Sequence, residues 1–305
     1  MRITRPCSGL ILGIMILAGV PGAIRAQQSG DHVEQGNFLF DRYDDDEAIQ
    51  QYTEVIGLDP NDCIAYNNRG NAYIKKGNCD QAIEDFDQAI KLSPNYALAY
   101  YNRGIAYDDK GDYDLAIQDY TQALKLDSNF ALAYDNRGYL YRVIGDYDLA
   151  IQDYIQALVL SGSDAAHFHN LGLAYWDKGQ HDVAVDNFNS ALLMDANDTS
   201  AYIYRGLYRD ARGYYDLAIQ DYTQALKLDS NYALAYNNRG IAYRHKGQYD
   251  LAIQDCTQAL KLNPNFGGAY YNRGIAYDGK GDYNAAIQDC SQALKLDSSY
   301  RAPLY

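Results

Sequence analysis

Basic residues are scarce in this chain of 305 residues. Lysine and arginine number 26 against 40 aspartates and glutamates, so the formal net charge is −14 at pH 7. Nucleic acids and anionic lipid surfaces are bound through clustered lysine and arginine, and this deficit argues against either as a partner. Because 48% of the residues are apolar, the chain can bury a core and is not an acidic disordered tail.

Recognisable catalytic patterns are also missing. The sequence shows no Ser-His-Asp, Cys-His or paired-carboxylate constellation, no P-loop and no dinucleotide-binding glycine fingerprint. His167 and His169 would lie about 200° apart around a helix, which is a poor geometry for holding one metal ion together. We therefore predict a protein that is not an enzyme and that holds neither a metal nor another cofactor.

The N-terminus has the pattern of a secretory signal. Arg2 and Arg5 precede an apolar run over 10–20, Pro21 and Gly22 end it, and small residues lead to Ala26. The apolar stretch is shorter than the roughly 20 residues that a membrane-spanning helix needs. This favours a signal peptide over 1–26 that is cleaved on export. We expect a periplasmic or secreted protein with no transmembrane segment in the mature chain, and retention at the membrane by an uncleaved signal is the alternative.

Tryptophan and phenylalanine are rare, at one and seven residues, whereas tyrosine occurs 32 times. Such a bias suggests one motif copied many times, and the segment 111–138 recurs at 213–240 with three changes. The offset of 102 residues is three times 34. A register of 34 residues divides the chain without gaps into eight repeats and a short tail, at 29–62, 63–96, 97–130, 131–164, 165–198, 199–232, 233–266, 267–300 and 301–305.

Each repeat has the periodicity of two helices. In the third repeat Tyr100, Gly104 and Tyr107, and then Ala116 and Tyr120, recur at steps of three and four residues. The eighth position of every repeat is glycine and the twentieth is alanine, so two antiparallel helices can approach closely. A glycine at the fifteenth position separates the two halves in seven of the eight repeats.

This pattern resembles the tetratricopeptide repeat family over residues 29–300. The resemblance implies an all-α fold, a right-handed superhelical α-solenoid of stacked antiparallel helix pairs. It also implies a concave groove lined by the first helix of each repeat. The chain departs from the family at Tyr43, where the turn glycine belongs, and at Arg209, where a tyrosine belongs. We expect local distortion in those two repeats.

Position 7 is arginine and position 23 is aspartate in the same six repeats. The first and fifth repeats lack both, and the fifth has Leu171 and Asn187 instead. Because the middles of two antiparallel helices lie opposite each other, we predict six ion pairs between helices: Arg69–Asp85, Arg103–Asp119, Arg137–Asp153, Arg205–Asp221, Arg239–Asp255 and Arg273–Asp289. The alternative, a basic stripe that binds anions, is disfavoured because the matched acids would neutralise it.

Position 6, which faces the groove in the resembled family, is mostly asparagine. An amide offers both a donor and an acceptor, so a ladder of amides could bind the backbone of an extended peptide without reading its sequence. A solvated helix face, or asparagine inherited passively as the repeats duplicated, explains the pattern equally well. The candidate residues are Asn68, Asn102, Asn136, Asn170, Asn238 and Asn272.

The fourth to sixth repeats differ from the others at groove positions, with residues that the repeat pattern does not supply elsewhere. They supply Arg142, His169, Tyr204 and the single tryptophan, Trp176. Tryptophan, tyrosine and arginine are typical anchors of binding hot spots, and we predict a partner-binding site here. A degenerate repeat that drifts under weak selection is the competing explanation.

These features together predict an exported scaffold that binds an extended peptide or a protein partner in its groove, as an envelope or secretion-complex adaptor would. No repeat has the lysine and arginine pair with which some family members clamp a C-terminal carboxylate. One alternative is a self-assembling structural protein that stacks through its last repeat as a homo-oligomer. Another is a carbohydrate-handling subunit in which Tyr101, Trp176, Tyr204 and Tyr271 stack sugars.

Four cysteines lie beyond the predicted signal. Cys256 and Cys290 occupy equivalent positions in successive repeats, about 10 Å apart at helix-packing distances, and a disulfide needs Cα atoms within about 7 Å. Cys63 and Cys79 fall at opposite ends of one helix hairpin. We predict four free thiols, the last two of them buried. We also expect the apolar edge of the last repeat to be partly exposed.

Overall fold

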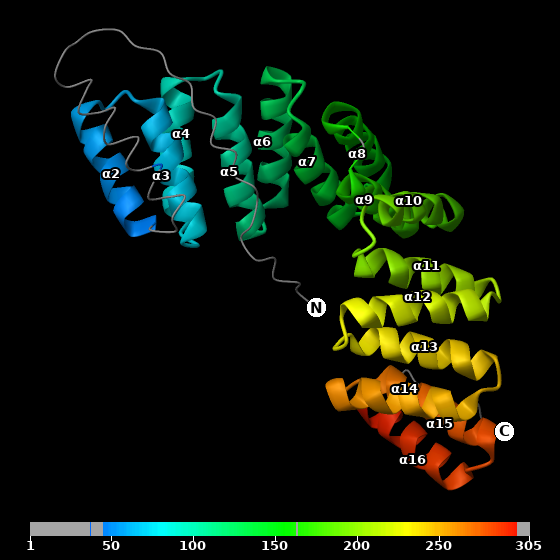
Figure 1. Cartoon of the computed structure of the whole chain (residues 1–305). Helices are drawn as coiled ribbons and strands as arrows, with labels where there is room; N and C mark the ends of the chain where they lie inside the picture. Colours follow the sequence, from blue (N-terminus) through cyan, green and yellow to red (C-terminus); the bar gives the residue numbers. More distant parts are fainter. Residues whose placement is uncertain (1–36, 38–44, 163, 298–305) are drawn as a thin grey trace. The chain divides into compact units, whose positions relative to one another are not determined.

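The computed structural model describes residues 37, 45–162 and 164–297. The predicted signal over 1–26, Tyr43 and the tail over 301–305 lie outside them. Within the described residues the regular structure is helical throughout, and the chain forms two compact units, 1–160 and 161–305. Successive helices within each unit pack as antiparallel pairs (Figure 1). The predicted all-α solenoid of helix pairs is confirmed.

The helix bounds follow the 34-residue register. The first unit holds α2 (Asp45–Leu58), α3 (Cys63–Lys75), α4 (Cys79–Leu92), α5 (Ala97–Lys110), α6 (Tyr113–Leu126), α7 (Ala131–Ile144) and α8 (Tyr147–Ser161), whose last residue opens the second unit. The second unit continues with α9 (Ala165–Asp177), α10 (His181–Met194), α11 (Thr199–Ala211), α12 (Tyr215–Leu228), α13 (Ala233–His245), α14 (Tyr249–Leu262), α15 (Gly267–Lys280) and α16 (Tyr283–Leu296). No helix in these ranges is both long and apolar enough to cross a bilayer.

The turn inside each repeat requires glycine because of its backbone conformation. Gly111 ends α5 with a φ of 83°, and a Cβ added there would meet no atom within 4 Å. A left-handed φ is therefore the reason for glycine at this position, since side-chain-bearing residues rarely adopt it. The glycine at position 8 has a different reason. A Cβ on Gly104 would lie 2.7 Å from the ring of Tyr120, which is fully buried at position 24.

All six predicted ion pairs are present. Arg103 is representative: its Nε and Nη2 lie 2.7 Å from the two carboxylate oxygens of Asp119. The guanidinium also lies over the rings of Tyr100 and Tyr107 at 5.6 and 5.9 Å from their centroids. The repeated tyrosines at positions 4 and 11 thus enclose the arginine. The other five pairs are Arg69–Asp85, Arg137–Asp153, Arg205–Asp221, Arg239–Asp255 and Arg273–Asp289.

Each of these arginines also crosses to the preceding repeat, a contact that the sequence analysis missed. The Nη1 atom of Arg137 donates to the Thr121 hydroxyl at 2.9 Å, and that of Arg103 reaches a carboxylate oxygen of Asp87 at 2.5 Å. One guanidinium therefore joins three helices. Burial raises the pKa of the Asp119 carboxyl, although the hydrogen bonds and the charge of Arg103 lower it. Such pairs carry a large desolvation penalty, and most of their effect appears when one partner is removed.

The last helix exposes part of its apolar face. The sequence of α16 repeats that of α14 with three changes, and the corresponding face of α14 packs against α15. Ile287 on α16 is 67% exposed, whereas Ile253, its counterpart on α14, is half-buried. The four cysteines of the described chain are free, as predicted. Cys256 is buried, but Cys290 is only half-buried, so the prediction that both are buried is wrong for Cys290.

Candidate partner-binding site

An aromatic cluster joins α9, α10 and α11 in the second unit. The Trp176 ring lies 4.4 Å from that of His181, 5.2 Å from Tyr204 and 6.5 Å from Phe188, measured between centroids. Tyr204 stacks on Phe188 at 5.3 Å with the ring planes 13° apart. Phe188 is fully buried, Trp176 and Tyr204 are half-buried, and His181 is exposed. We call these four residues the fifth-repeat aromatic cluster.

The register explains why this cluster forms at the fifth and sixth repeats. Tyr204 takes the place of the usual asparagine at position 6, and its ring covers Phe188 from the next repeat. Two of the predicted site residues, Trp176 and Tyr204, therefore lie together. Phe188 and His181 were not among the predicted site residues. His181 lies two residues after the turn glycine, where no groove residue was expected.

A polar pair borders the cluster. His169 Nδ1 lies 2.6 Å from a carboxylate oxygen of Asp198, and the His169 ring meets Phe188 at 5.9 Å. Asp198 also caps α11 by accepting from the backbone N–H of Ala201 at 2.9 Å. Burial disfavours the charged form of Asp198, but the hydrogen bonds from His169 and from the backbone outweigh it and lower the pKa of this carboxyl. Asp198 is thus held as a carboxylate and fixes the His169 ring beside Phe188.

The asparagine ladder connects repeats more than it faces solvent. Asn102 donates from Nδ2 to Oδ1 of Asn67 at 2.9 Å, and Asn272 donates likewise to Asn237 at 3.0 Å. Asn136 donates to the Tyr101 hydroxyl at 3.1 Å. In each case position 6 of one repeat bonds position 5 of the repeat before it. The Asn-Asn doublets at 67–68 and 237–238 are the sequence signal for this link, because they place an amide at position 5 beside the one at position 6.

The six ladder residues differ in their availability to a partner. Asn102 and Asn238 are only 3% and 6% exposed. The other four are half-buried: Asn68, Asn136, Asn170 and Asn272. A role for these amides in binding a peptide backbone stays a prediction.

Two further candidates belong to the first unit. Arg142 belongs to the first unit, where its guanidinium lies over the Tyr139 ring at 5.9 Å. Tyr101 is only 5% exposed and packs against Phe130 and Tyr120. The prediction that Tyr101 stacks a sugar is therefore wrong, because its ring fills the core between repeats.

One family model of the tetratricopeptide repeat matches at 97–130, 233–266 and 268–300, and a second model of this repeat matches at 168–198. A related model of the TPR repeat matches at 36–77, 70–110, 138–179 and 211–244. The chain belongs to the tetratricopeptide repeat family. No curated protein is similar enough to match.

Solved structures show the same fold. A TPR protein from Cytophaga hutchinsonii has a TM-score of 0.64 at 22% identity and covers 81% of this chain and 98% of its own. The Cut9–Hcn1 hetero-tetramer of APC/C has a TM-score of 0.59 at 20% identity over 89% of this chain, which spans only 54% of that one. YrrB, described as a TPR protein with an unusual peptide-binding site, has a TM-score of 0.53 at 26% identity, covering 61% of this chain and 96% of its own.

Proposed function

We propose that this TPR protein is an exported, non-enzymatic scaffold that binds a segment of a partner protein at the fifth-repeat aromatic cluster. The observation that carries the proposal is the half-exposed pair Trp176 and Tyr204, held rigidly over the buried Phe188 ring. Rigid aromatic side chains with one face buried and one face accessible are typical anchors of protein interfaces. The peptide-binding site reported for YrrB, which has the same fold, adds support.

The net charge of the chain favours a cationic partner segment. Beside the cluster, Asp177 adjoins Trp176 in the chain and is exposed, whereas the carboxylate of Asp182 is 71% exposed but pairs with Arg212 at 2.7 Å. The whole chain carries a formal charge of −14. Acidic surfaces attract basic partners and accelerate their association. We therefore expect a partner segment with an apolar or aromatic anchor flanked by lysine or arginine.

The test is selection of peptides from a random display library on the mature chain, followed by measurement of Kd for the best binder. Trp176→Ala should weaken binding by at least about 30-fold, as expected for a hot-spot residue. Tyr204→Asn, which restores the residue found at position 6 of most repeats, should also weaken it. The matched control is Tyr214→Ala, because Tyr214 is 58% exposed and lies outside the cluster. Equal Kd values for all three variants would overturn the proposal.

Self-assembly is a second candidate function, favoured by the exposed face of α16. The same residue types on α14 pack against a helix of this chain, so the proposed occupant is a second copy. Ile287→Lys should convert a concentration-dependent oligomer to monomer in sedimentation at tens of micromolar. Leu193→Lys, at a residue that is 89% exposed on α10, is the control. A monomeric wild-type mass at these concentrations would rule this function out.

A further inference from the structure

The sixth repeat has a second arginine, Arg209, in addition to the one that pairs with the aspartate at position 23. At position 11 the other repeats of the described chain have tyrosine, and the sixth has Arg209. We expected this departure to distort the repeat locally. The structure shows instead that α11 runs without interruption over Thr199–Ala211 and that Arg209 turns to the ion pair already present. That expectation is therefore wrong.

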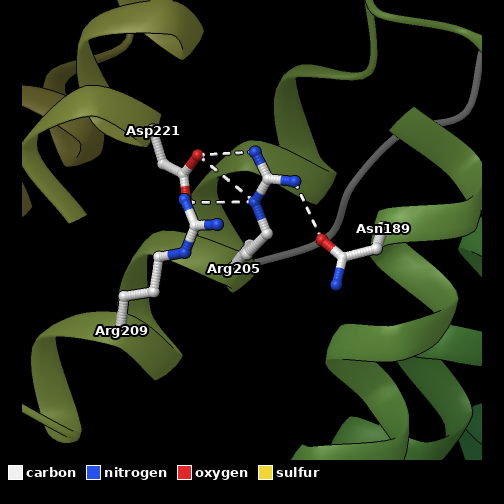
Figure 2. A network of polar contacts seen from close by, with 4 residues as sticks. All are labelled: Asn189, Arg205, Arg209 and Asp221. Carbon is white, nitrogen blue, oxygen red and sulfur yellow. Dashed lines mark hydrogen bonds and ion pairs between the residues drawn. The ribbon is translucent and has the colours of Figure 1, made fainter. Parts of the chain in front are cut away.

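Two guanidinium groups share one carboxylate at this point. Arg205 Nη2 lies 2.7 Å from Oδ1 of Asp221, and Arg209 Nη1 lies 2.7 Å from Oδ2, as Figure 2 shows. Arg205 Nη1 donates to Oδ1 of Asn189 at 2.9 Å. Asn189 is neutral, so the group holds two positive charges and one negative charge.

The third repeat shows the opposite balance at equivalent positions. Arg103 stands alone between two acids, Asp119 in its own repeat and Asp87 in the preceding one. Asn189 is the counterpart of Asp87, and Arg209 is the counterpart of the uncharged Tyr107. The sixth repeat thus lacks an acid where the third has one, and it has an additional cation.

The surplus charge can be reached from solvent. The side chain of Asp221 is only 3% exposed, whereas those of Arg205 and Arg209 are 16% and 24% exposed. Among the described residues, the polar contacts of Arg209 are to Asp221, through one of the five N–H donors of its guanidinium. The remaining donors are available to an external acceptor.

In the third repeat, the surface beside the equivalent arginine, Arg103, is recessed. A depression of about 360 Å³ there is lined by Tyr100, Arg103 and Lys125, among others. The sixth repeat has the same residue types at the corresponding positions, with Tyr202, Arg205 and Lys227, because α12 repeats the sequence of α6 without change. Arg205 therefore lies on a surface built from the residue types that form this recess, whereas Tyr107, the counterpart of Arg209, does not line it.

We propose that the Arg205–Arg209 pair binds a single carboxylate of a partner protein. The planar guanidinium donors match the two oxygens of a carboxylate. Asn189 fills the position beside Arg205 that Asp87 fills beside Arg103. The donors open to the carboxylate are therefore those of Arg209 that do not bond Asp221. The surplus of one positive charge is balanced by a monoanion and exceeded by a dianionic phosphate. This site does not depend on the aromatic cluster, so either can fail without the other.

The experiment uses the full chain, with the Nε–H resonances of arginine followed by NMR. The probes are acetate, a blocked peptide with one internal glutamate, an unblocked C-terminal glycine peptide, a neutral amide peptide and inorganic phosphate. We expect saturable shifts of the Arg209 resonance with acetate and no shift with the neutral peptide. The glutamate and the C-terminal peptide distinguish a side-chain carboxylate from a chain terminus.

Two variants that borrow residues from other repeats provide the controls. Arg209→Tyr restores the usual residue at position 11, and Asn189→Asp supplies the internal acid that Asp87 provides elsewhere. Both variants should fold, and each should weaken acetate binding at least tenfold. Because Arg209→Tyr lacks the Arg209 resonance, its acetate binding is measured from the shift of the Arg205 resonance. The proposal is overturned if wild type shows no saturable shift, if phosphate binds more tightly than acetate, or if either variant binds acetate as well as wild type.

Discussion

Asp153→Asn is expected to lower the free energy of unfolding of the first unit by about 3–5 kcal/mol, the usual effect of removing one partner from a buried ion pair. The Asp153 side chain is 7% exposed and that of Arg137 is 16% exposed. The substitution leaves the guanidinium between Tyr134 and Tyr141 with a neutral amide in place of the bidentate carboxylate, and its other partner, Thr121, is uncharged. Urea unfolding followed by circular dichroism measures the change.

The control for this prediction is already present in the chain. The fifth repeat has Leu171 and Asn187 at the positions of Arg137 and Asp153. The double variant Arg137→Leu with Asp153→Asn therefore installs a natural combination, and it should recover most of the stability that Asp153→Asn alone removes. If the double variant unfolds at the same urea concentration as the single one, the loss does not come from an unpaired buried charge.

Phe188→Ala is expected to destabilise the second unit by about 3–5 kcal/mol, the range for truncating a buried phenylalanine. Phe188 is fully buried between Gly172 and Tyr204, and a Cβ on Gly172 would lie 2.7 Å from its ring. Removing the ring leaves a void beneath the aromatic cluster, so Trp176 and Tyr204 also lose their support. Hydrogen exchange of α9, α10 and α11, read by mass spectrometry, should show the loss of protection.

Phe188→Tyr is the matched substitution, because tyrosine occupies this position in four of the other repeats. It keeps the ring and adds one hydroxyl, so exchange in the three helices should stay close to that of wild type. Faster exchange in Phe188→Ala that is confined to α12 or beyond would contradict the packing role assigned to Phe188.

Much of the fold could be predicted because it recurs. The 34-residue period fixed the register, and the register placed position 7 opposite position 23, so all six Arg–Asp pairs followed. The contacts between repeats were harder to predict from the sequence. The bond from Asn102 to Asn67 depends on how far one repeat is displaced from the next, and no periodicity within a repeat contains that distance.

The sequence identified the unusual residues of the site, because they depart from the repeat pattern, but it did not predict their contacts. Trp176 stood out as the single tryptophan of the chain, and Tyr204 stood out because no other repeat has an aromatic residue at position 6. Their mutual contact, and the part played by His181, required the actual angles between α9, α10 and α11. Arg209 was recognised as unusual, but its contact with Asp221 was not foreseen, because the ion pair was assumed to be complete with one arginine.

The arginine that joins three helices has a consequence for the cooperativity of folding. In a linear array, stability is a sum of the intrinsic terms of each repeat and the coupling between neighbours. Arg103, Arg137, Arg205, Arg239 and Arg273 each contribute to that coupling through an acceptor in the preceding repeat. The fifth repeat has Leu171 in this role, and the acceptor position before it is Ile155. Neither side chain can form a hydrogen bond, so the fifth repeat has no such arginine with which to contribute to cooperative folding.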